Sequence, residues 1–188
     1  MEERYEQVKE LLGEKYQRDS DFLYSVVKKL DLNLNSKVLD IGTGRGFMAI
    51  TLAVAGYEVT TGEPEGDNWG DWRTYADKAE VLNLIKFRAF VAEDLPFDDE
   101  KFDGVFSYGS FHHVQNKADS LREFIRVIKP NGLAVVFEFT QEGIDRIRQR
   151  HPNHPDPVDV IKYGEQIGAK PQIIRSDVIN AYIFEKKE

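Results

Sequence analysis

The chain has 188 residues, of which 31% are charged, and its 33 Asp and Glu against 25 Lys and Arg give a formal net charge of −8. This length is enough for one domain with a full sheet between two layers of helices, and the negative charge argues against nucleic acid or another polyphosphate as a partner. The sequence contains no cysteine, which excludes disulfides, thiolate metal sites and thiol nucleophiles.

The N-terminal residues 1–35 are predicted to form two helices, over roughly 3–11 and 20–30. The first four residues read M-E-E-R and lack the basic and apolar regions of a signal peptide. The longest apolar run of the chain, 48–55, is too short to cross a bilayer. We therefore expect a cytoplasmic protein that makes no contact with a membrane.

The first predicted strand, near 37–42, leads into a glycine-rich turn, because residues 38–47 read V-L-D-I-G-T-G-R-G-F. Glycines let the backbone approach a ligand closely, and the helix that follows offers free amides at its N-terminus. A dinucleotide-binding turn has the spacing G-x-G-x-x-G, and counted from Gly42 its third glycine would fall at Phe47. The turn therefore departs from the dinucleotide pattern, and an ordinary tight turn without a ligand is the alternative.

A second strand is predicted near 57–62, where β-branched residues lead to the carboxylate of Glu63. Glu63 lies about 20 residues past the glycine turn, the distance at which nucleotide-binding α/β folds place an acid for the ribose hydroxyls. The alternative is a glutamate that begins a loop and contacts no ligand.

Two further strands are predicted near 86–91 and 103–108, and each is followed by a distinctive segment. Residues 91–97 read V-A-E-D-L-P-F after the third strand, and residues 110–114 read S-F-H-H-V after the fourth. The carboxyl ends of parallel strands are where open α/β sheets bind their ligands, so both segments are candidates for a site.

A long amphipathic helix follows the fourth strand. Its apolar residues recur at the helical spacing i, i+3, i+4 and i+7, at Leu121, Phe124, Ile125 and Ile128. The sequence K-P-N-G at 129–132 is predicted to end this helix, and a buried strand is predicted over 133–139.

The connection over 140–168 contains the segment H-P-N-H-P-D-P at 151–157. Three prolines make this segment a stiff, non-helical connector. Its two histidines and one aspartate match no established ligand spacing, so a surface loop is favoured over a metal site. Three nearby arginines are predicted to lie on a solvated helix rather than to form an anion site: Arg146, Arg148 and Arg150.

The last two strands are predicted near 171–176 and 179–186. Only Asp177 and Val178 join them, which is too short for a helical crossover, so the two strands must pair antiparallel. The earlier strands alternate with helices, and this alternation predicts a largely parallel sheet.

Taken together, the D-x-G-x-G-x-G turn, the L-P-F segment, the F-H-H-V exit loop and the K-P-x-G helix end resemble the class I S-adenosylmethionine-dependent methyltransferases, specifically the type-11 methyltransferase group. This resemblance implies an α/β fold with a Rossmann-like seven-stranded sheet of order 3-2-1-4-5-7-6, mostly parallel with a terminal antiparallel hairpin and helices on both faces. It also implies a single domain over 1–188, with 1–35 as an N-terminal lid and 140–168 as a substrate-side connection.

The resemblance implies S-adenosyl-L-methionine as cofactor and S-adenosyl-L-homocysteine as product. The sulfonium methyl would move by in-line displacement to a small-molecule acceptor, which mainly requires alignment and exclusion of water. Carried over onto this sequence, the cofactor contacts are Asp40, Gly42, Thr43, Gly44, Gly46, Glu63, Ala92, Glu93 and Tyr108. Asp40 is expected either to support the glycine turn or to meet the amino group of the cofactor. Trp69 and Trp72 are candidates for stacking on the adenine edge, with core packing as the alternative.

One position departs from the family pattern. Aligning the L-P-F segment places Val91 where the family has an Asp that binds the adenine amino group, and an apolar residue accepts no hydrogen bond. We expect Glu93 to reach the adenine instead. Asp94 is one alternative, and adenine held by packing and main-chain contacts alone is the other.

The catalytic candidates are His112 and His113, at the exit of the fourth strand. One of them could accept a proton from the acceptor or bind it, and the alternative is that the pair only supports the loop. Glu138, near the end of the fifth strand, is a further candidate. No metal is expected.

Two other functions stay open. The first is a regulator or subunit that binds the cofactor without catalysis, which the substitution at Val91 keeps open. The second is a nicotinamide-dependent oxidoreductase, which Phe47 and the terminal hairpin disfavour. No motif in the sequence identifies the methyl acceptor or predicts the oligomeric state.

Overall fold

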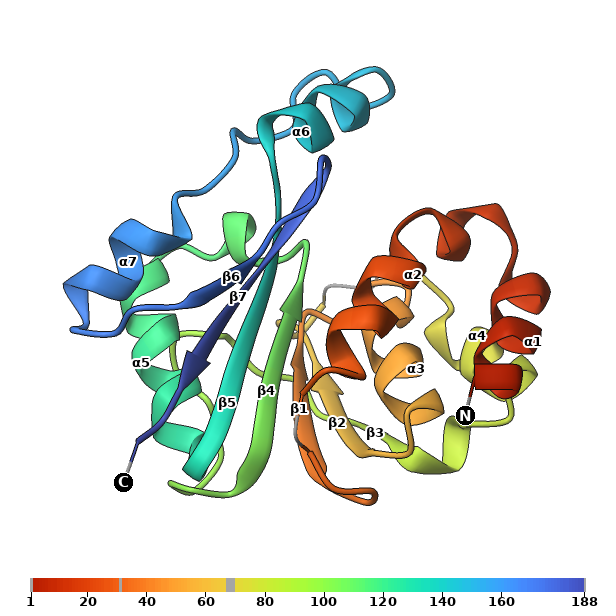
Figure 1. The fold of residues 1–188 in the computed structure, drawn as a ribbon, viewed down its shortest axis with the longest axis horizontal. Helices are drawn as coiled ribbons and strands as arrows, with labels where there is room; N and C mark the ends of the chain where they lie inside the picture. The colour runs from red at the N-terminus through yellow and green to blue at the C-terminus, as the bar shows by residue number, and fades with distance from the viewer. Residues whose placement is uncertain (1, 31, 67–69, 188) are drawn as a thin grey trace.

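The computed structural model describes residues 2–30, 32–66 and 70–187, which contain one seven-stranded sheet of order β3-β2-β1-β4-β5-β7-β6 (Figure 1). The strands are β1 (Lys37–Ile41), β2 (Glu58–Gly62), β3 (Ile85–Phe87), β4 (Phe102–Tyr108), β5 (Ile128–Phe139), β6 (Gln172–Ile174) and β7 (Ile179–Glu185). The helices are α1 (Glu2–Leu12), α2 (Glu14–Val27), α3 (Phe47–Val54), α4 (Trp72–Lys78), α5 (Lys117–Val127), α6 (Gln141–Arg148) and α7 (Val160–Gln166), with short 3₁₀ turns η1 (Leu82–Leu84) and η2 (Phe111–His113).

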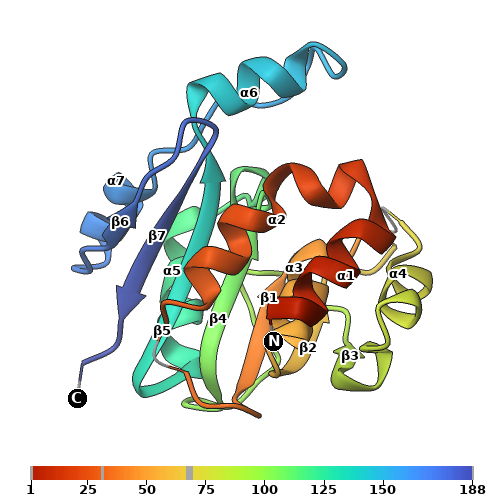
Figure 2. The same cartoon turned by 45° about the vertical axis from the view of Figure 1, so that its right-hand side comes forward.

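The strand order and the terminal hairpin confirm the fold predicted from the sequence. Strands β1 to β5 pair parallel, whereas β7 pairs antiparallel with both β5 and β6. The parallel strands therefore end at one edge of the sheet. At this edge β1 leads into the glycine turn and α6 projects beyond the end of β5 (Figure 2).

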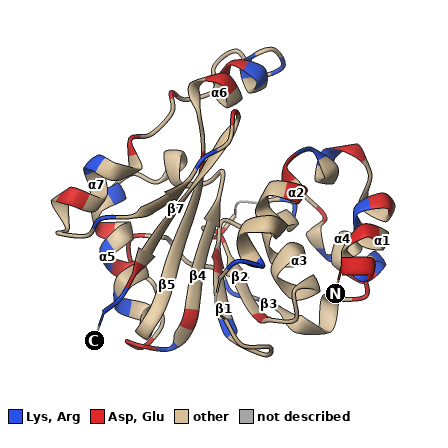
Figure 3. Ribbon diagram, in the orientation of Figure 1, with Lys and Arg blue, Asp and Glu red and all other residues tan. Residues whose placement is uncertain are grey.

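Helices cover both faces of the sheet because successive strand residues point to opposite sides. Val38 and Phe106 belong to the core beneath α1, α2 and α3, whereas Leu39 and Val105 belong to the core beneath α5 and α7. All four side chains are fully buried. Figure 3 shows that charged residues lie mainly on the outer helices and loops, while the central strands carry few.

The element boundaries differ most from the sequence predictions at α2, β3 and β5. Helix α2 begins at Glu14, directly after Gly13, and β3 ends at Phe87. Strand β5 begins at Ile128, so the K-P-N-G segment lies within the strand instead of between helix and strand. The cause is a register shift against β4, where Asn131 adopts a positive φ of 62° and lets the chain bulge and continue.

None of the helices in the described ranges combines the length and apolar character that crossing a membrane requires.

Candidate functional site

A large cavity lies along the carboxyl edge of the sheet, with a volume of about 1380 Å³. Its walls come from the glycine turn, Glu63, segments 90–93 and 108–110, the loop 113–116 and the connector 150–155. Segments distant in sequence meet there because β1, β2 and β4 all end at this edge.

The glycine turn requires glycine for both conformation and space. Gly42, Gly44 and Gly46 have φ values of 85°, 48° and 77°, a region that side chains disfavour. A Cβ on Gly42 would lie 2.6 Å from the Cβ of Ser110, and one on Gly46 would lie 2.8 Å from the Cβ of Trp72. Gly42 and Gly44 line the cavity, whereas Gly46 is the N-cap of α3.

Glu63 lies beside this turn, at the end of β2. Its side chain is buried at the edge of the cavity, and its Oε2 accepts a hydrogen bond of 2.9 Å from the backbone amide of Gly44. The glycine turn thereby holds a carboxylate at the cavity edge through Gly44.

Asp40 and Thr43 lie behind the turn rather than in the cavity lining. The Thr61 hydroxyl donates to Asp40 Oδ2 at 2.7 Å, and the hydroxyls of Thr43 and Thr61 lie 2.9 Å apart. Asp40 is fully buried, its Oδ1 has no hydrogen-bond partner among the described residues, and burial raises its pKa to about 8. These two residues therefore support the turn from inside the core.

The segment after β3, which is expected to contact adenine, lines the cavity with both apolar and charged side chains. Val91 is 44% exposed and Ala92 is buried, and both present apolar atoms to the cavity. Glu93 also lines the cavity, but its Oε1 already accepts hydrogen bonds from the amides of Gln115 and Asn116 at 2.9 and 3.1 Å. The Glu93 carboxylate thus ties the loop after η2 to the segment after β3.

Of the two tryptophans singled out in the sequence, Trp72 does not line the cavity. Trp72 is buried in the core and stacks near Phe87, with ring centroids 6.2 Å apart. Trp69 lies outside the described residues.

Tyr108 connects the cavity to the N-terminal helices. Its hydroxyl donates to Asp19 Oδ2 at 2.5 Å, and burial raises the pKa of Tyr108. Asp19 is itself buried and also accepts from Arg18 at 2.6 Å. On the same helix α2, the hydroxyl of Tyr16 lies 2.9 Å from that of Thr51. Helix α2 is thus fixed to the sheet beside the cavity.

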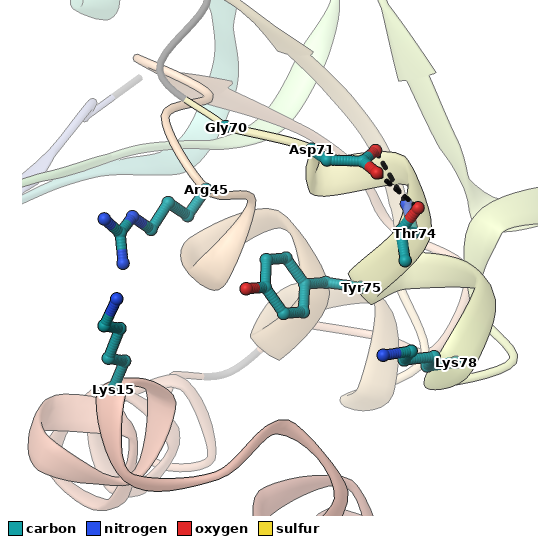
Figure 4. Close-up of a pocket in the computed structure, with 7 residues that line it drawn as sticks. All are labelled: Lys15, Arg45, Gly70, Asp71, Thr74, Tyr75 and Lys78. Carbon is teal, nitrogen blue, oxygen red and sulfur yellow. Dashed lines mark hydrogen bonds between the residues drawn. The ribbon is translucent and has the colours of Figure 1, made fainter.

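Replacing Tyr108 by Phe is expected to lower the free energy of unfolding by about 1.5–3 kcal/mol, because a buried hydrogen bond to a charged group is lost. Urea denaturation measures this difference. Tyr75→Phe is the matched control, since the Tyr75 hydroxyl makes no hydrogen bond to the other side chains drawn in Figure 4. Equal stabilities of the two variants would show that the Tyr108 to Asp19 contact does not hold α2.

The histidines at the exit of β4 occupy different environments. The His112 side chain is 1% exposed, and its Nδ1 lies 2.7 Å from Glu138 Oε1. Glu138 also accepts hydrogen bonds from the amides of His112 and Phe139, both at 3.0 Å. His113 lines the cavity, and burial lowers its pKa. The sequence candidates His112, His113 and Glu138 therefore lie together, but only His113 faces the cavity.

The connector brings His154 to the same place. The ring of His154 lies 4.8 Å from that of His112 and 5.8 Å from that of His113, between centroids, and burial lowers the pKa of His154. Arg148 holds the connector by donating to the carbonyl of His154 at 2.8 Å and to Asp156 at 2.7 Å. The connector is therefore a wall of the cavity, and Arg148 is a clamp rather than part of a solvated face.

A smaller cavity of about 310 Å³ adjoins the glycine turn at Arg45. Figure 4 shows the side chains of Lys15 and Arg45 pointing toward one another across it, with Lys78 farther along the wall. Arg45 lines both cavities, so this basic pocket adjoins the larger one. No motif in the sequence singled it out, because Lys15 and Lys78 come from α2 and α4.

Comparison with known proteins gives matches at the level of family, sequence and fold. A family model described as a methyltransferase domain matches residues 39–136, from β1 into β5. The chain is 33% identical over 114 residues to 27-O-demethylrifamycin SV methyltransferase from Amycolatopsis mediterranei, covering 58% of this chain and 41% of that protein. It is 27% identical over 117 residues to a ubiquinone/menaquinone biosynthesis C-methyltransferase from Geotalea daltonii, covering 61% and 50%.

The chain thus spans about half the length of these two relatives. Among solved structures, a SAM-dependent methyltransferase from Aquifex aeolicus superposes with a TM-score of 0.71 at 20% identity, covering 96% of this chain and 97% of that one. The similarity to this solved structure shows that the two chains share a fold.

Proposed function

Since the chain belongs to the methyltransferase domain family, we propose that it moves the sulfonium methyl of S-adenosyl-L-methionine to an acceptor by in-line displacement and releases S-adenosyl-L-homocysteine. The observation that carries this proposal is the Glu63 carboxylate, which accepts a hydrogen bond from the amide of Gly44 and lines the cavity together with Gly42 and Gly44. A carboxylate in this place suits the two adjacent hydroxyls of one ribose, and at the spacing of a dinucleotide-binding turn the third glycine is replaced by Phe47.

The cavity is large enough for two molecules. Its volume of about 1380 Å³ exceeds the roughly 300–1,000 Å³ of a typical ligand site. Cofactor and acceptor can therefore lie side by side, as direct transfer requires. Methyl transfer from a sulfonium needs mainly this alignment and the exclusion of water.

Adenine would lie against segment 90–93. The exposed Val91 and the neighbouring Ala92 supply an apolar surface for its ring, and Glu93 is the acceptor nearest to them in sequence. Because Glu93 Oε1 is already engaged by two amides, adenine would be held by packing together with the remaining acceptor capacity of that carboxylate.

We propose a small molecule as the acceptor, between His113 and the connector. The names of both relatives refer to small molecules, and the net charge of −8 disfavours nucleic acid. His113 would contact the acceptor, whereas His112 is a positioning residue whose ring is held by Glu138. The first 35 residues would act as a cover fixed by Asp19 and Tyr108.

The test is turnover with a pool of candidate acceptors. Purified protein is incubated with S-adenosyl-L-methionine and a small-molecule fraction of cell extract, and S-adenosyl-L-homocysteine and methylated products are measured by mass spectrometry. We expect S-adenosyl-L-homocysteine to accumulate only when the fraction is present. Cofactor binding without turnover would favour the regulator, and binding of NADH without S-adenosyl-L-methionine would favour the oxidoreductase.

A further inference from the structure

Three imidazoles from two distant segments meet at the wall of the large cavity. His112 and His113 come from η2 after β4, and His154 comes from the connector between α6 and α7. One nitrogen of each ring lies within 4.8 Å of the corresponding atoms of the other two. The spacing of residues in the sequence gave no sign of this cluster, because the connector alone matches no metal-ligand pattern.

The hydrogen bonds around His112 determine which of its nitrogens is available. The Glu138 carboxylate accepts from two backbone amides and lies 2.7 Å from His112 Nδ1. Since a carboxylate oxygen only accepts, we assign the proton of this contact to His112 Nδ1. The lone pair of His112 is then on Nε2. That atom is buried and has no hydrogen-bond partner among the described residues. A buried nitrogen without a partner is unfavourable unless something else binds it.

His154 is oriented in a similar way. Its Nδ1 lies 3.2 Å from the carbonyl oxygen of Pro155, which can only accept, so Nδ1 carries the proton and Nε2 the lone pair. The backbone of His154 is held by the clamp from Arg148. Histidines that bind metals usually donate one ring nitrogen's proton to a carboxylate or a carbonyl, and the other nitrogen binds the ion. His112 and His154 are both held in this way.

We propose that His112, His113 and His154 bind a divalent transition-metal ion of the zinc type, with its open position facing the cavity. Imidazole nitrogens suit Zn²⁺, Co²⁺ and Ni²⁺, and three protein ligands with one open position are typical of zinc sites that bind a substrate. Tetrahedral geometry with metal–nitrogen distances of about 2.0–2.1 Å places the nitrogens roughly 3.3 Å apart. The rings must approach by up to about 1.5 Å, and His154 lies on a connector outside the sheet, where such a shift requires no strand to move.

The ion would select the chemistry of the acceptor. Its open position faces the space next to His113, where the hydroxyl oxygen of a small molecule would bind. The ion would make that hydroxyl more acidic, and its proton would pass to solvent water before the oxygen takes the methyl group. This last step rests on the proposed function. Metal binding itself does not, because it requires neither cofactor nor acceptor.

The experiment uses the full chain without an affinity tag, stripped of metal by a chelator and titrated with Co²⁺ in the absence of S-adenosyl-L-methionine. We expect one ion per chain with the intense visible absorption of four-coordinate Co²⁺, and displacement of that signal by Zn²⁺. His154→Ala should raise the Kd for Co²⁺ by at least about 100-fold. Glu138→Gln, which keeps all three ligands, should raise it by about 10- to 100-fold.

His151→Ala is the matched control, because His151 lies on the same connector but outside the cluster. It should bind Co²⁺ as the wild type does, and circular dichroism confirms that each variant is folded. Absence of the four-coordinate spectrum from the wild type, or equal affinities of His154→Ala and His151→Ala, would overturn the proposal. Because no cofactor is present, a negative result leaves the proposed methyl transfer standing, and failure of methyl transfer leaves this test unaffected.

Discussion

The Glu63→Ala variant is expected to bind S-adenosyl-L-methionine about 100- to 10,000-fold more weakly than the wild type. The reason is that two ribose hydroxyls would lose a charged acceptor, and each such hydrogen bond contributes about 1.5–3 kcal/mol. Isothermal titration calorimetry with S-adenosyl-L-methionine, S-adenosyl-L-homocysteine and NADH measures the loss. Both sulfur ligands should be affected alike, since they share the ribose.

Glu65→Ala is the control for this variant, because Glu65 is an exposed glutamate two residues farther along the chain. Glu63→Gln provides a second comparison, since the amide keeps one acceptor oxygen and the bond to Gly44 but loses the charge. Unchanged affinity in Glu63→Ala, in a protein that remains folded, would place the nucleoside elsewhere.

The stability of the protein is expected to fall as the pH rises from about 4 to about 8, through the ionisation of Asp40. Burial raises the pKa of Asp40 from 3.8 in the unfolded chain to about 8 in the folded protein. The folded state therefore holds a proton that the unfolded state has released, and its advantage is complete below pH 4 and lost above pH 8. The total effect is on the order of 5 kcal/mol.

Asp40→Asn should remove this dependence. The amide oxygen can still accept from Thr61, but the residue no longer titrates. Urea denaturation at several pH values between 5 and 8 should show a wild-type slope that is steeper than that of the variant by up to about 1.4 kcal/mol per pH unit. The exposed Asp98→Asn is the control and should retain the wild-type slope. Parallel curves for wild type and Asp40→Asn would mean that Asp40 is ionised in the folded protein.

The fold could be predicted from the sequence because its determinants are local. The link between β6 and β7, residues 175–178, is too short for a helical crossover and allows only an antiparallel hairpin. The three glycines of the turn all adopt the positive φ that their residue type permits. The extended start of β5 could not be predicted, because Pro130 and Gly132 normally end elements and only the bulge at Asn131 lets the strand include them.

The site could be predicted only in part, since side-chain direction decides which residues reach the cavity. Asp40 and Thr43 belong to the same motif as Gly42 and Gly44. Their side chains nevertheless point into the core, where both form hydrogen bonds with the hydroxyl of Thr61. The position of His154 depends on the Arg148 clamp and on the path of the connector, neither of which residue spacing encodes. The cavity, the contacts of Glu93 and the histidine cluster therefore required the structure.

The position of β7 has a consequence for how the sheet is completed. In the described sheet β7 lies between β5 and β6. Although β6 comes before β7 in the sequence, β6 joins the sheet only by pairing with β7. Until β7 docks, the long and largely apolar edge of β5 has open backbone groups on that side. Such an edge can pair with the strands of another chain. The last hairpin therefore protects the folding protein against aggregation, and mutations that delay its closure should lower the yield of soluble protein before they alter the native site.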